Sequence, residues 1–267
     1  ENAQVSSVFG GNEVSGTVGG NTELVFGYGA MVNGWTYGGG AGRADSIPTE
    51  VTGSTNITIN DGQFLHNVYG GGAWFGAKVG SSNITINGGN LEAAEVYGGG
   101  EEKSEVTGKA YIAIQGGTIG GVCASGAGFS GMESTVGEAD IRLLGGTVEY
   151  FSALPCEEAS ILGDLSVVVS GDSFAATDLD FGFSVTKALQ TVSITLKDGK
   201  AANLEINSKV TERLQITLDN ASVGNLRLAT GVLTEDTEAV LSYINCGSPE
   251  SKWGSCNGGG YAGSASF

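Results

Sequence analysis

Short runs of alternating apolar and polar residues recur along the chain. Each run is a triplet whose outer residues are apolar, and the first members are Leu24, Ile57, Ile84, Ile112, Ile141, Val167, Ile194 and Ile216. Side chains alternate between the two faces of a strand, so the outer residues of each triplet share one face. The pattern therefore predicts a short β-strand in every repeat.

Three further positions keep a nearly fixed place relative to each triplet. The first lies seven residues after the first triplet residue and comprises Met31, Phe64, Leu91, Ile119, Val148, Phe174, Ala201 and Val223. The second lies ten to twelve residues after the first triplet residue and comprises Thr36, Val68, Val96, Val122, Phe151, Leu179, Leu204 and Leu226. The third lies five or six residues before the first triplet residue and comprises Val18, Val51, Val79, Val106, Val136, Ile161, Leu189 and Val210. Four registers repeated in this way indicate a solenoid.

The repeat predicts an all-β fold, a single-stranded right-handed parallel β-helix of about eight to nine rungs. A turn of about 27 residues cannot bury its apolar face alone, but stacked copies enclose one continuous core. The hand follows from the general handedness of parallel crossovers. A leucine-rich repeat does not fit because the sequence has no LxxLxL pattern and no helix in each repeat, and an antiparallel sandwich does not explain the constant offsets. We expect residues 1–245 to form the β-helix and residues 246–267 to form a cap or a Gly/Ser-rich tail.

Composition narrows the classes of partner. The chain has 267 residues, 47 of them glycine, and a formal net charge of −17. Without a cluster of basic residues it lacks the positive surface that nucleic acid or an anionic membrane requires. Its apolar runs are shorter than the roughly 18 residues typical of a membrane span. We therefore expect neither a nucleic-acid partner nor membrane insertion.

The cysteines and the single histidine offer little metal chemistry. Cys123, Cys156, Cys246 and Cys256 form no CxxC pair, and His66 is the only histidine. This spacing predicts no zinc site and no cofactor. A disulfide could join Cys246 and Cys256 across a short loop in an oxidising compartment, and two free thiols are the alternative. Cys123 and Cys156 are expected to be separate thiols.

Aromatic residues fall on one register in the first half of the chain. The ladder consists of Phe9, Tyr37, Tyr69 and Tyr97, each followed by two or three glycines. One interpretation is structural, because stacked rings would cover bare glycine backbone. The other is a ligand-binding strip for sugar rings. The candidate residues for that strip are Trp35, Tyr37, Tyr69, Trp74, Phe75 and Tyr97.

Two polar patterns admit a structural and a chemical interpretation. Asn56, Asn60, Asn83 and Asn87 repeat around two triplets, as expected for an asparagine ladder that joins stacked rungs. Arg142 is the best candidate for the base of a polysaccharide lyase, with Asp140 on the same side of its strand. A solvated ion pair explains Arg142 and Asp140 equally well, and the net charge of −17 would repel acidic polysaccharides.

One motif resembles a known group of proteins. The segment from Asn83 to Gly89 followed by Val96 to Gly100, with its copy at Asn56 to Gly62 and Val68 to Gly72, resembles the Gly-rich repeats of secreted or wall-attached surface proteins of gut-dwelling Gram-positive bacteria. The resemblance covers about residues 8–230 and implies a pectate-lyase-like right-handed β-helix in an adhesin-like, extracellular protein.

Three functions follow as hypotheses. The first is a non-catalytic surface module that recognises a glycan or a host surface protein, as a monomeric module of a larger chain. The second is a polysaccharide lyase or glycoside hydrolase of the same fold, which needs converging carboxylates and, for a lyase, a base near Arg142. The third is a structural spacer, which predicts a uniformly polar surface without a pocket.

Overall fold

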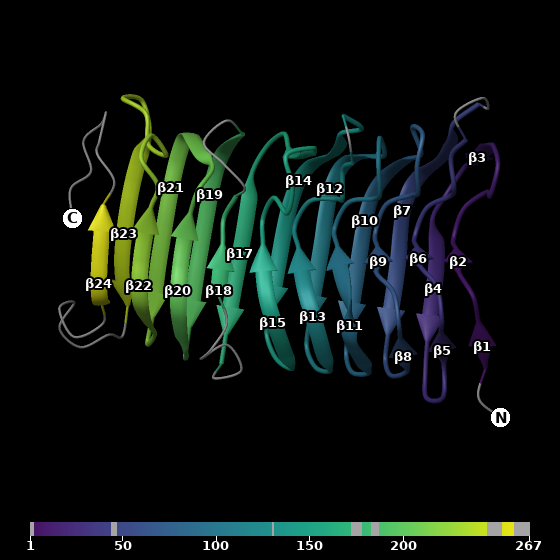
Figure 1. Cartoon of the computed structure of the whole chain (residues 1–267), viewed down its shortest axis with the longest axis horizontal. Helices are drawn as coiled ribbons and strands as arrows, with labels where there is room; N and C mark the ends of the chain where they lie inside the picture. Colours follow the sequence, from purple (N-terminus) through teal and green to yellow (C-terminus); the bar gives the residue numbers. More distant parts are fainter. Residues whose placement is uncertain are drawn as a thin grey trace.

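The protein is a stack of short strands along one long axis (Figure 1). The computed structural model describes residues 3–43, 47–129, 131–171, 178–182, 187–244 and 253–258. Every named element in these ranges is a β-strand. Within the same ranges no helix is long and apolar enough to cross a membrane.

The strands form two sheets, and every pair of named strands is parallel. The 13-stranded sheet contains β1 (Gln4–Val5), β2 (Val8–Phe9), β5 (Met31–Val32), β6 (Thr36–Tyr37), β8 (Gln63–Phe64), β9 (Val68–Tyr69), β11 (Asn90–Tyr97), β13 (Thr118–Cys123), β15 (Thr147–Ser152), β18 (Asp178–Asp180), β20 (Lys200–Ile206), β22 (Ser222–Leu228) and β24 (Trp253–Gly258). The 11-stranded sheet contains β3 (Gly16–Val18), β4 (Thr22–Phe26), β7 (Thr49–Ile59), β10 (Lys78–Ile86), β12 (Glu105–Ile114), β14 (Ser134–Leu143), β16 (Ala159–Ile161), β17 (Leu165–Ser170), β19 (Ala188–Lys197), β21 (Lys209–Asp219) and β23 (Glu238–Ile244).

The predicted registers define the stacking. Leu24 of β4 pairs with Ile57, Ile57 with Ile84, and the same column continues through the triplets to Ile216. The column from Thr36 to Leu226 is likewise continuous in the 13-stranded sheet. The predicted parallel β-helix is thus confirmed as a β-solenoid of about 8 turns.

One predicted column needs a correction at its first member. Phe64 pairs with Val32, whereas Met31 pairs with Gln63. Val32 is fully buried and Met31 only half-buried, so Val32 is the residue that points into the core. The loop between β4 and β5 is one residue longer than the repeat spacing indicated. Phe174 of the same column lies outside the described residues.

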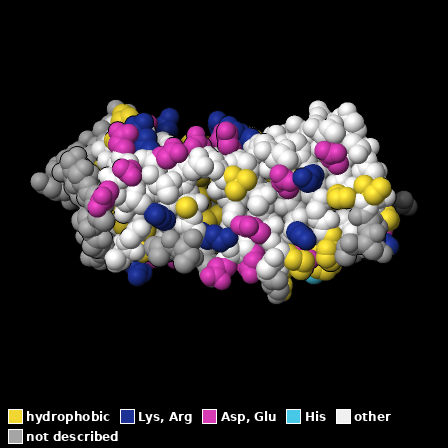
Figure 2. Space-filling model, turned by 90° about the horizontal axis from the view of Figure 1, so that it is seen from above, with side chains coloured by type: hydrophobic (Ala, Val, Ile, Leu, Met, Phe, Trp, Pro, Cys, Tyr) yellow, Lys and Arg dark blue, Asp and Glu magenta, His cyan; other side chains and the backbone are white. Residues whose placement is uncertain are grey.

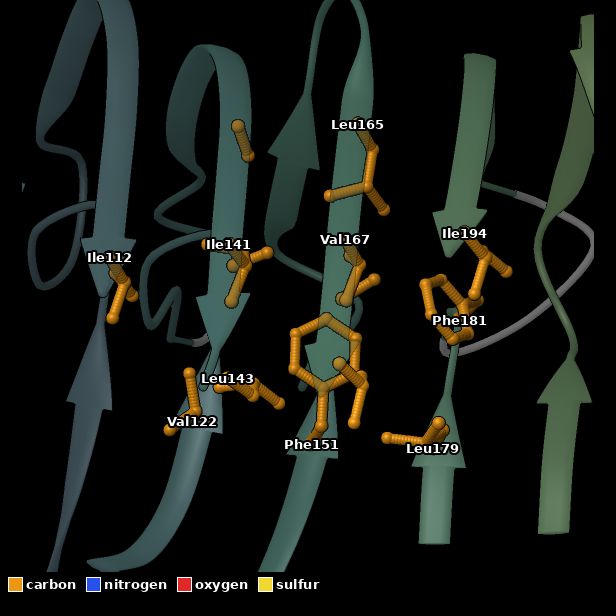
Figure 3. Packing of buried hydrophobic residues seen from close by; sticks show 14 of the residues in the cluster. Ile112, Val122, Ile141, Leu143, Phe151, Leu165, Val167, Leu179, Phe181 and Ile194 are labelled. Atoms are coloured by element: carbon orange, nitrogen blue, oxygen red, sulfur yellow. The ribbon is translucent and has the colours of Figure 1, made fainter. Parts of the chain in front are cut away.

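A single hydrophobic core fills the space between the two sheets (Figure 3). Phe151 of β15 faces Val167 and Leu143 of the opposite sheet, and the ring centroids of Phe151 and Phe181 lie 5.2 Å apart. Parallel strands bury every second side chain here, because each rung is covered by its neighbours and by the opposite sheet. The core therefore runs the length of the molecule.

Hydroxyl groups explain why glycine follows the ladder tyrosines. The Thr22 hydroxyl donates to the Gly38 carbonyl at 2.8 Å, and Thr55 and Ser82 donate in the same way to Gly70 and Gly98. A Cβ atom at Gly70 would lie 2.7 Å from the Cβ atom of Ser82. The close approach that permits these hydrogen bonds leaves no room for a side chain at that glycine.

The predicted asparagine ladders are present. The amide of Asn83 donates to Asn56 at 3.1 Å, and the amide of Asn87 donates to Asn60 at 2.8 Å. Each bond joins neighbouring rungs on the outside of the 11-stranded sheet, as expected for stacked amides.

The C-terminal region extends the 13-stranded sheet. Strand β24 pairs in parallel with β22, with Leu226 opposite Cys256. Residues 245–252 and 259–267, which include Cys246, lie outside the described residues, so the predicted disulfide between Cys246 and Cys256 falls there. Cys123 and Cys156 are free thiols, as expected.

Candidate functional site

The predicted aromatic ladder is present on the outer face of the 13-stranded sheet. Phe9, Tyr37, Tyr69 and Tyr97 occupy paired positions on consecutive rungs. Neighbouring ring centroids lie 5.0, 5.0 and 4.8 Å apart, and their planes differ by 9°, 8° and 16°. The rings thus form one continuous stack.

The tyrosines of this ladder are buried. Their exposed fractions are 1% for Tyr37, 2% for Tyr69 and 6% for Tyr97. Together with Ala41, Ala73 and Cys123 they form a second, smaller hydrophobic cluster. Their ring faces are covered by one another, so they are not accessible to a sugar. The structural interpretation of the ladder therefore applies, and the expectation that these tyrosines contact a ligand is corrected.

The tyrosine hydroxyls are anchored by carboxylates. Tyr37 donates a hydrogen bond to Glu101, and Tyr97 donates one to Glu95. Burial raises the pKa of both tyrosines far above the usual value, and the neighbouring carboxylate adds to this rise. Burial likewise raises the pKa of Glu101. The hydroxyls stay protonated and act as fixed donors.

The other predicted aromatic residues are exposed. The exposed fractions are 41% for Trp35, 36% for Trp74 and 37% for Phe75. The Trp35 ring lies 4.7 Å from the His66 ring, and Trp74 lies 6.4 Å from Tyr37. We call Trp35, His66, Trp74 and Phe75 the aromatic patch. In Figure 2, hydrophobic side chains gather around the cyan histidine, near the N-terminal half of the molecule.

A strained loop presents part of this patch. Trp74 and Phe75 have φ angles of 54° and 32°, in the left-handed region that side chains other than glycine rarely adopt. The next rung repeats the feature at Glu102 and Lys103, with φ angles of 38° and 30°. Backbone hydrogen bonds join the two loops, including one of 3.1 Å from the Trp74 amide to the Glu101 carbonyl. Strain of this kind is concentrated at functional sites.

A hollow of about 370 Å³ opens along β11, β13 and β15 of the 13-stranded sheet. Its lining comprises Asn67, Glu92, Ala93, Ala94, Glu95, Gly120, Glu149 and Tyr150. Asn67 follows His66 in the chain and receives the Thr36 amide on its carbonyl at 3.1 Å, so it lies one rung from Trp35. Asn67 therefore links Trp35 and His66 of the aromatic patch to one edge of the hollow.

Two glycines shape the hollow. Gly120 follows Ile119 of the paired column Leu91, Ile119 and Val148, at the point where β11 carries two extra residues between Leu91 and Glu95. A Cβ atom at Gly120 would lie 2.6 Å from the Glu92 carbonyl. At Gly121, it would lie 2.5 Å from the Tyr150 ring. The missing side chains leave room for the Glu92 carbonyl at Gly120 and for the Tyr150 ring at Gly121.

Glu95 is the centre of the polar groups in the hollow. Its carboxylate accepts hydrogen bonds from the hydroxyls of Tyr97 and Tyr150 and from the Asn67 amide at 3.4 Å. The Glu95 amide in turn donates to the Asn67 side chain at 3.0 Å. Burial and the bond to Glu95 raise the pKa of Tyr150. These hydrogen bonds hold the side chains that line the hollow in fixed positions.

Asn67, Glu95 and Tyr150 were not among the predicted site residues. The sequence does contain a signal for these three residues. Each directly precedes a core residue of one column, Val68, Val96 or Phe151, and therefore faces outward. The sequence could not show that Tyr150 leans across Gly121 toward Glu95.

Arg142, the candidate base of the lyase alternative, lies elsewhere. Arg142 and Asp140 belong to β14 of the 11-stranded sheet, form an exposed ion pair of 3.2 Å, and leave the Arg142 guanidinium 5.6 Å from the Tyr111 ring centroid. No lysine or arginine is among the described residues that line the hollow. The base that a lyase requires is therefore not brought to these carboxylates.

The free thiols and acidic groups suggest no metal chemistry in the part of the chain that the structure describes. No group of three or more His, Cys, Asp or Glu residues there could hold a metal ion. Burial raises the pKa of the thiols of Cys123 and Cys156, which keeps them in the unreactive protonated form.

No protein-family model, curated protein or solved structure matches this chain. The function is therefore argued from the site itself.

Proposed function

We propose that the chain is a non-catalytic, extracellular β-solenoid module that recognises a glycan through the aromatic patch and the adjoining hollow. The observation that carries the proposal is the position of Trp35: its exposed ring packs against His66, one rung from Asn67 and the hollow. An apolar platform beside a few fixed polar groups is the usual design of a small-ligand site.

The chemistry of the patch suits a sugar. One face of a pyranose ring is rich in C–H groups, and an indole ring offers a rigid apolar surface of similar size. Sugar hydroxyls both donate and accept hydrogen bonds, and the hollow offers the carboxylates of Glu92 and Glu149 as acceptors.

Binding without catalysis fits the state of Glu95. Its carboxylate already accepts hydrogen bonds from Tyr97, Tyr150 and Asn67. A carboxylate that accepts three hydrogen bonds is held in one position, which suits a binding site. A general acid, by contrast, must deliver a proton to the substrate. The ion pair of Arg142 and Asp140 lies on the other sheet.

The cellular setting follows from the repeats. Their resemblance to surface proteins of gut-dwelling Gram-positive bacteria supports an adhesin-like, secreted or wall-attached role. A spacer would need neither an exposed aromatic patch nor a hollow of about 370 Å³. A host surface protein is the alternative partner. A host protein that carries sugar chains would be both kinds of ligand at once.

A glycan array with matched variants tests the proposal. The variant Trp35→Ala/Trp74→Ala removes the platform, whereas Tyr28→Ala removes an aromatic residue that is 94% exposed outside the patch. We expect the wild type and Tyr28→Ala to bind the same glycans and the double variant to lose the signal, with all three giving the same circular dichroism. Retained binding by the double variant, or no binding by folded wild-type protein, would overturn the proposal.

A further inference from the structure

We infer that Glu101 is a positioning residue of the aromatic patch, because its carboxylate fixes the orientation in which the Trp74 indole is presented to a ligand. The inference deepens the proposed function, and its ligand-binding part rests on that function. That Glu101 holds Trp74 can be tested without any ligand.

Glu101 lies next to Trp74 because consecutive rungs are paired at this point. Ala73 forms a parallel bridge with Glu101 of the following rung, and the Trp74 amide donates to the Glu101 carbonyl at 3.1 Å. The Trp74 side chain is also hydrogen bonded to the Glu101 carboxylate. The indole N–H is the only donor that a tryptophan side chain has. The carboxylate therefore binds the one polar group of this ring.

Tyr37 of the ladder contacts both residues. Its hydroxyl donates to the Glu101 carboxylate, and its ring centroid lies 6.4 Å from that of Trp74, with an interplanar angle of 57°. The Tyr37 ring is buried and stacked between Phe9 and Tyr69. Because Tyr37 is fixed by this stack, the carboxylate that it anchors is a fixed acceptor for the indole N–H.

The Glu101 carboxylate depends on these neutral donors. In the part of the chain that the structure describes, no ion pair includes Glu101. Burial and the neighbouring Glu102 carboxylate raise the pKa of Glu101, whereas the hydrogen bonds from Tyr37 and Trp74 lower it. A half-buried carboxylate without a cation is stabilised by such donors, so the hydrogen bond constrains Trp74 as well as Glu101.

The hydrogen bond leaves part of the indole open to a ligand. Trp74 is still 36% exposed, although its N–H is bound. A ring that is held in one orientation before binding loses less conformational entropy when a sugar packs on it. Phe75 is similarly exposed, but its side chain has no polar atom through which a neighbour could hold it.

Nuclear magnetic resonance of the indole N–H groups tests the positioning without a ligand. Glu101→Gln removes the charged acceptor at nearly constant size, and Glu102→Gln removes the same charge one residue along the chain. We expect Glu101→Gln to shift the Trp74 signal and to speed its solvent exchange about tenfold, whereas Glu102→Gln should leave it in place. The Trp35 signal should stay unchanged in both variants.

A third variant guards against loss of the fold. Tyr37→Phe keeps the ring stack and removes only the donor that anchors Glu101, so it should shift the Trp74 signal in the same direction as Glu101→Gln. An unchanged Trp74 signal in the folded variants would overturn the inference.

A double-mutant cycle connects the positioning to recognition. Trp74→Phe keeps a ring but has no indole N–H for Glu101 to hold. By calorimetric titration, we expect Glu101→Gln to weaken the affinity for a glycan identified on the array about tenfold, and to have no further effect in Trp74→Phe. Unchanged affinity in Glu101→Gln, or equal losses in both backgrounds, would overturn the inference and leave glycan recognition intact. If folded wild-type protein binds no glycan, the proposed function fails, and the indole signals still decide whether Glu101 holds Trp74.

Discussion

Tyr150 lies across Gly121 and donates a hydrogen bond to Glu95, two strands away in the 13-stranded sheet. The ring fits because Gly121 has no side chain, since a Cβ atom there would lie 2.5 Å from it. The absence of a side chain at Gly121 thus allows the Tyr150 hydroxyl to reach the Glu95 carboxylate.

Gly121→Ala should displace the Tyr150 ring and destabilise the protein by about 1–3 kcal/mol, the usual cost of overpacking. Tyr150→Phe removes only the hydroxyl and should cost about 1 kcal/mol. Urea unfolding of both variants measures the difference. Wild-type stability in Gly121→Ala would show that the ring does not occupy the space above this glycine.

The sequence predicted the stacking because the relevant interactions repeat. The triplets around Ile84 and Ile112 recur at nearly constant spacing, and their alternation defines the buried face. The register slip at Met31 arose because loop length is less constrained than strand alternation.

The candidate site was only partly predictable from the sequence. Trp35 was among the candidates. The exposure of each aromatic candidate, however, depends on how the loops after the ladder tyrosines fold back, and the repeat pattern does not determine this. Ala41 and Ala73 of those loops join the buried cluster around Tyr69, whereas Trp74 is exposed. The contact between Tyr150 and Glu95 depends on a ring crossing a neighbouring strand, which a pattern of positions cannot reveal.

Tyr69→Ala should destabilise the protein by about 3–5 kcal/mol, because it removes a buried ring from the middle of the stack. Tyr69→Phe keeps the ring and should cost about 1 kcal/mol or less, since the Asn67 amide loses one long hydrogen bond of 3.3 Å. Denaturant midpoints of the two variants give the comparison. Similar losses in both would contradict a packing role for the ladder.

Thr36→Val should stabilise the protein by about 1 kcal/mol. Thr36 is fully buried, and its hydroxyl has no hydrogen-bond partner in the described part of the chain. Replacing an unsatisfied buried hydroxyl by a methyl group removes its desolvation cost. The matched change Thr55→Val should destabilise by a similar amount, because the Thr55 hydroxyl donates to the Gly70 carbonyl. Thermal unfolding of both tests the sign, and a lower melting temperature for Thr36→Val would contradict the account.

Asp180 should make stability depend on pH. Burial raises the pKa of Asp180 to about 6 from 3.8, despite the Asn207 amide that donates to it at 3.1 Å, and Glu205 on the neighbouring strand adds to the rise. A raised folded-state pKa gives stability that is present below the unfolded pKa and is lost as pH rises through about 6.

Asp180→Asn removes this titration. The melting temperature of the variant minus that of the wild type should therefore increase between about pH 4 and pH 7.5. A difference that stays constant over this interval would show that the folded-state pKa of Asp180 is close to its unfolded value.

Nuclear magnetic resonance of the tryptophan indole N–H groups tests the central claim of glycan recognition most directly. Trp35 and Trp74 belong to the aromatic patch, whereas Trp253 lies in β24 at the other end of the sheet. Titration with a glycan identified on the array should shift the signals of Trp35 and Trp74 and leave that of Trp253 unchanged. Saturable binding that leaves the Trp35 and Trp74 signals in place would contradict the account.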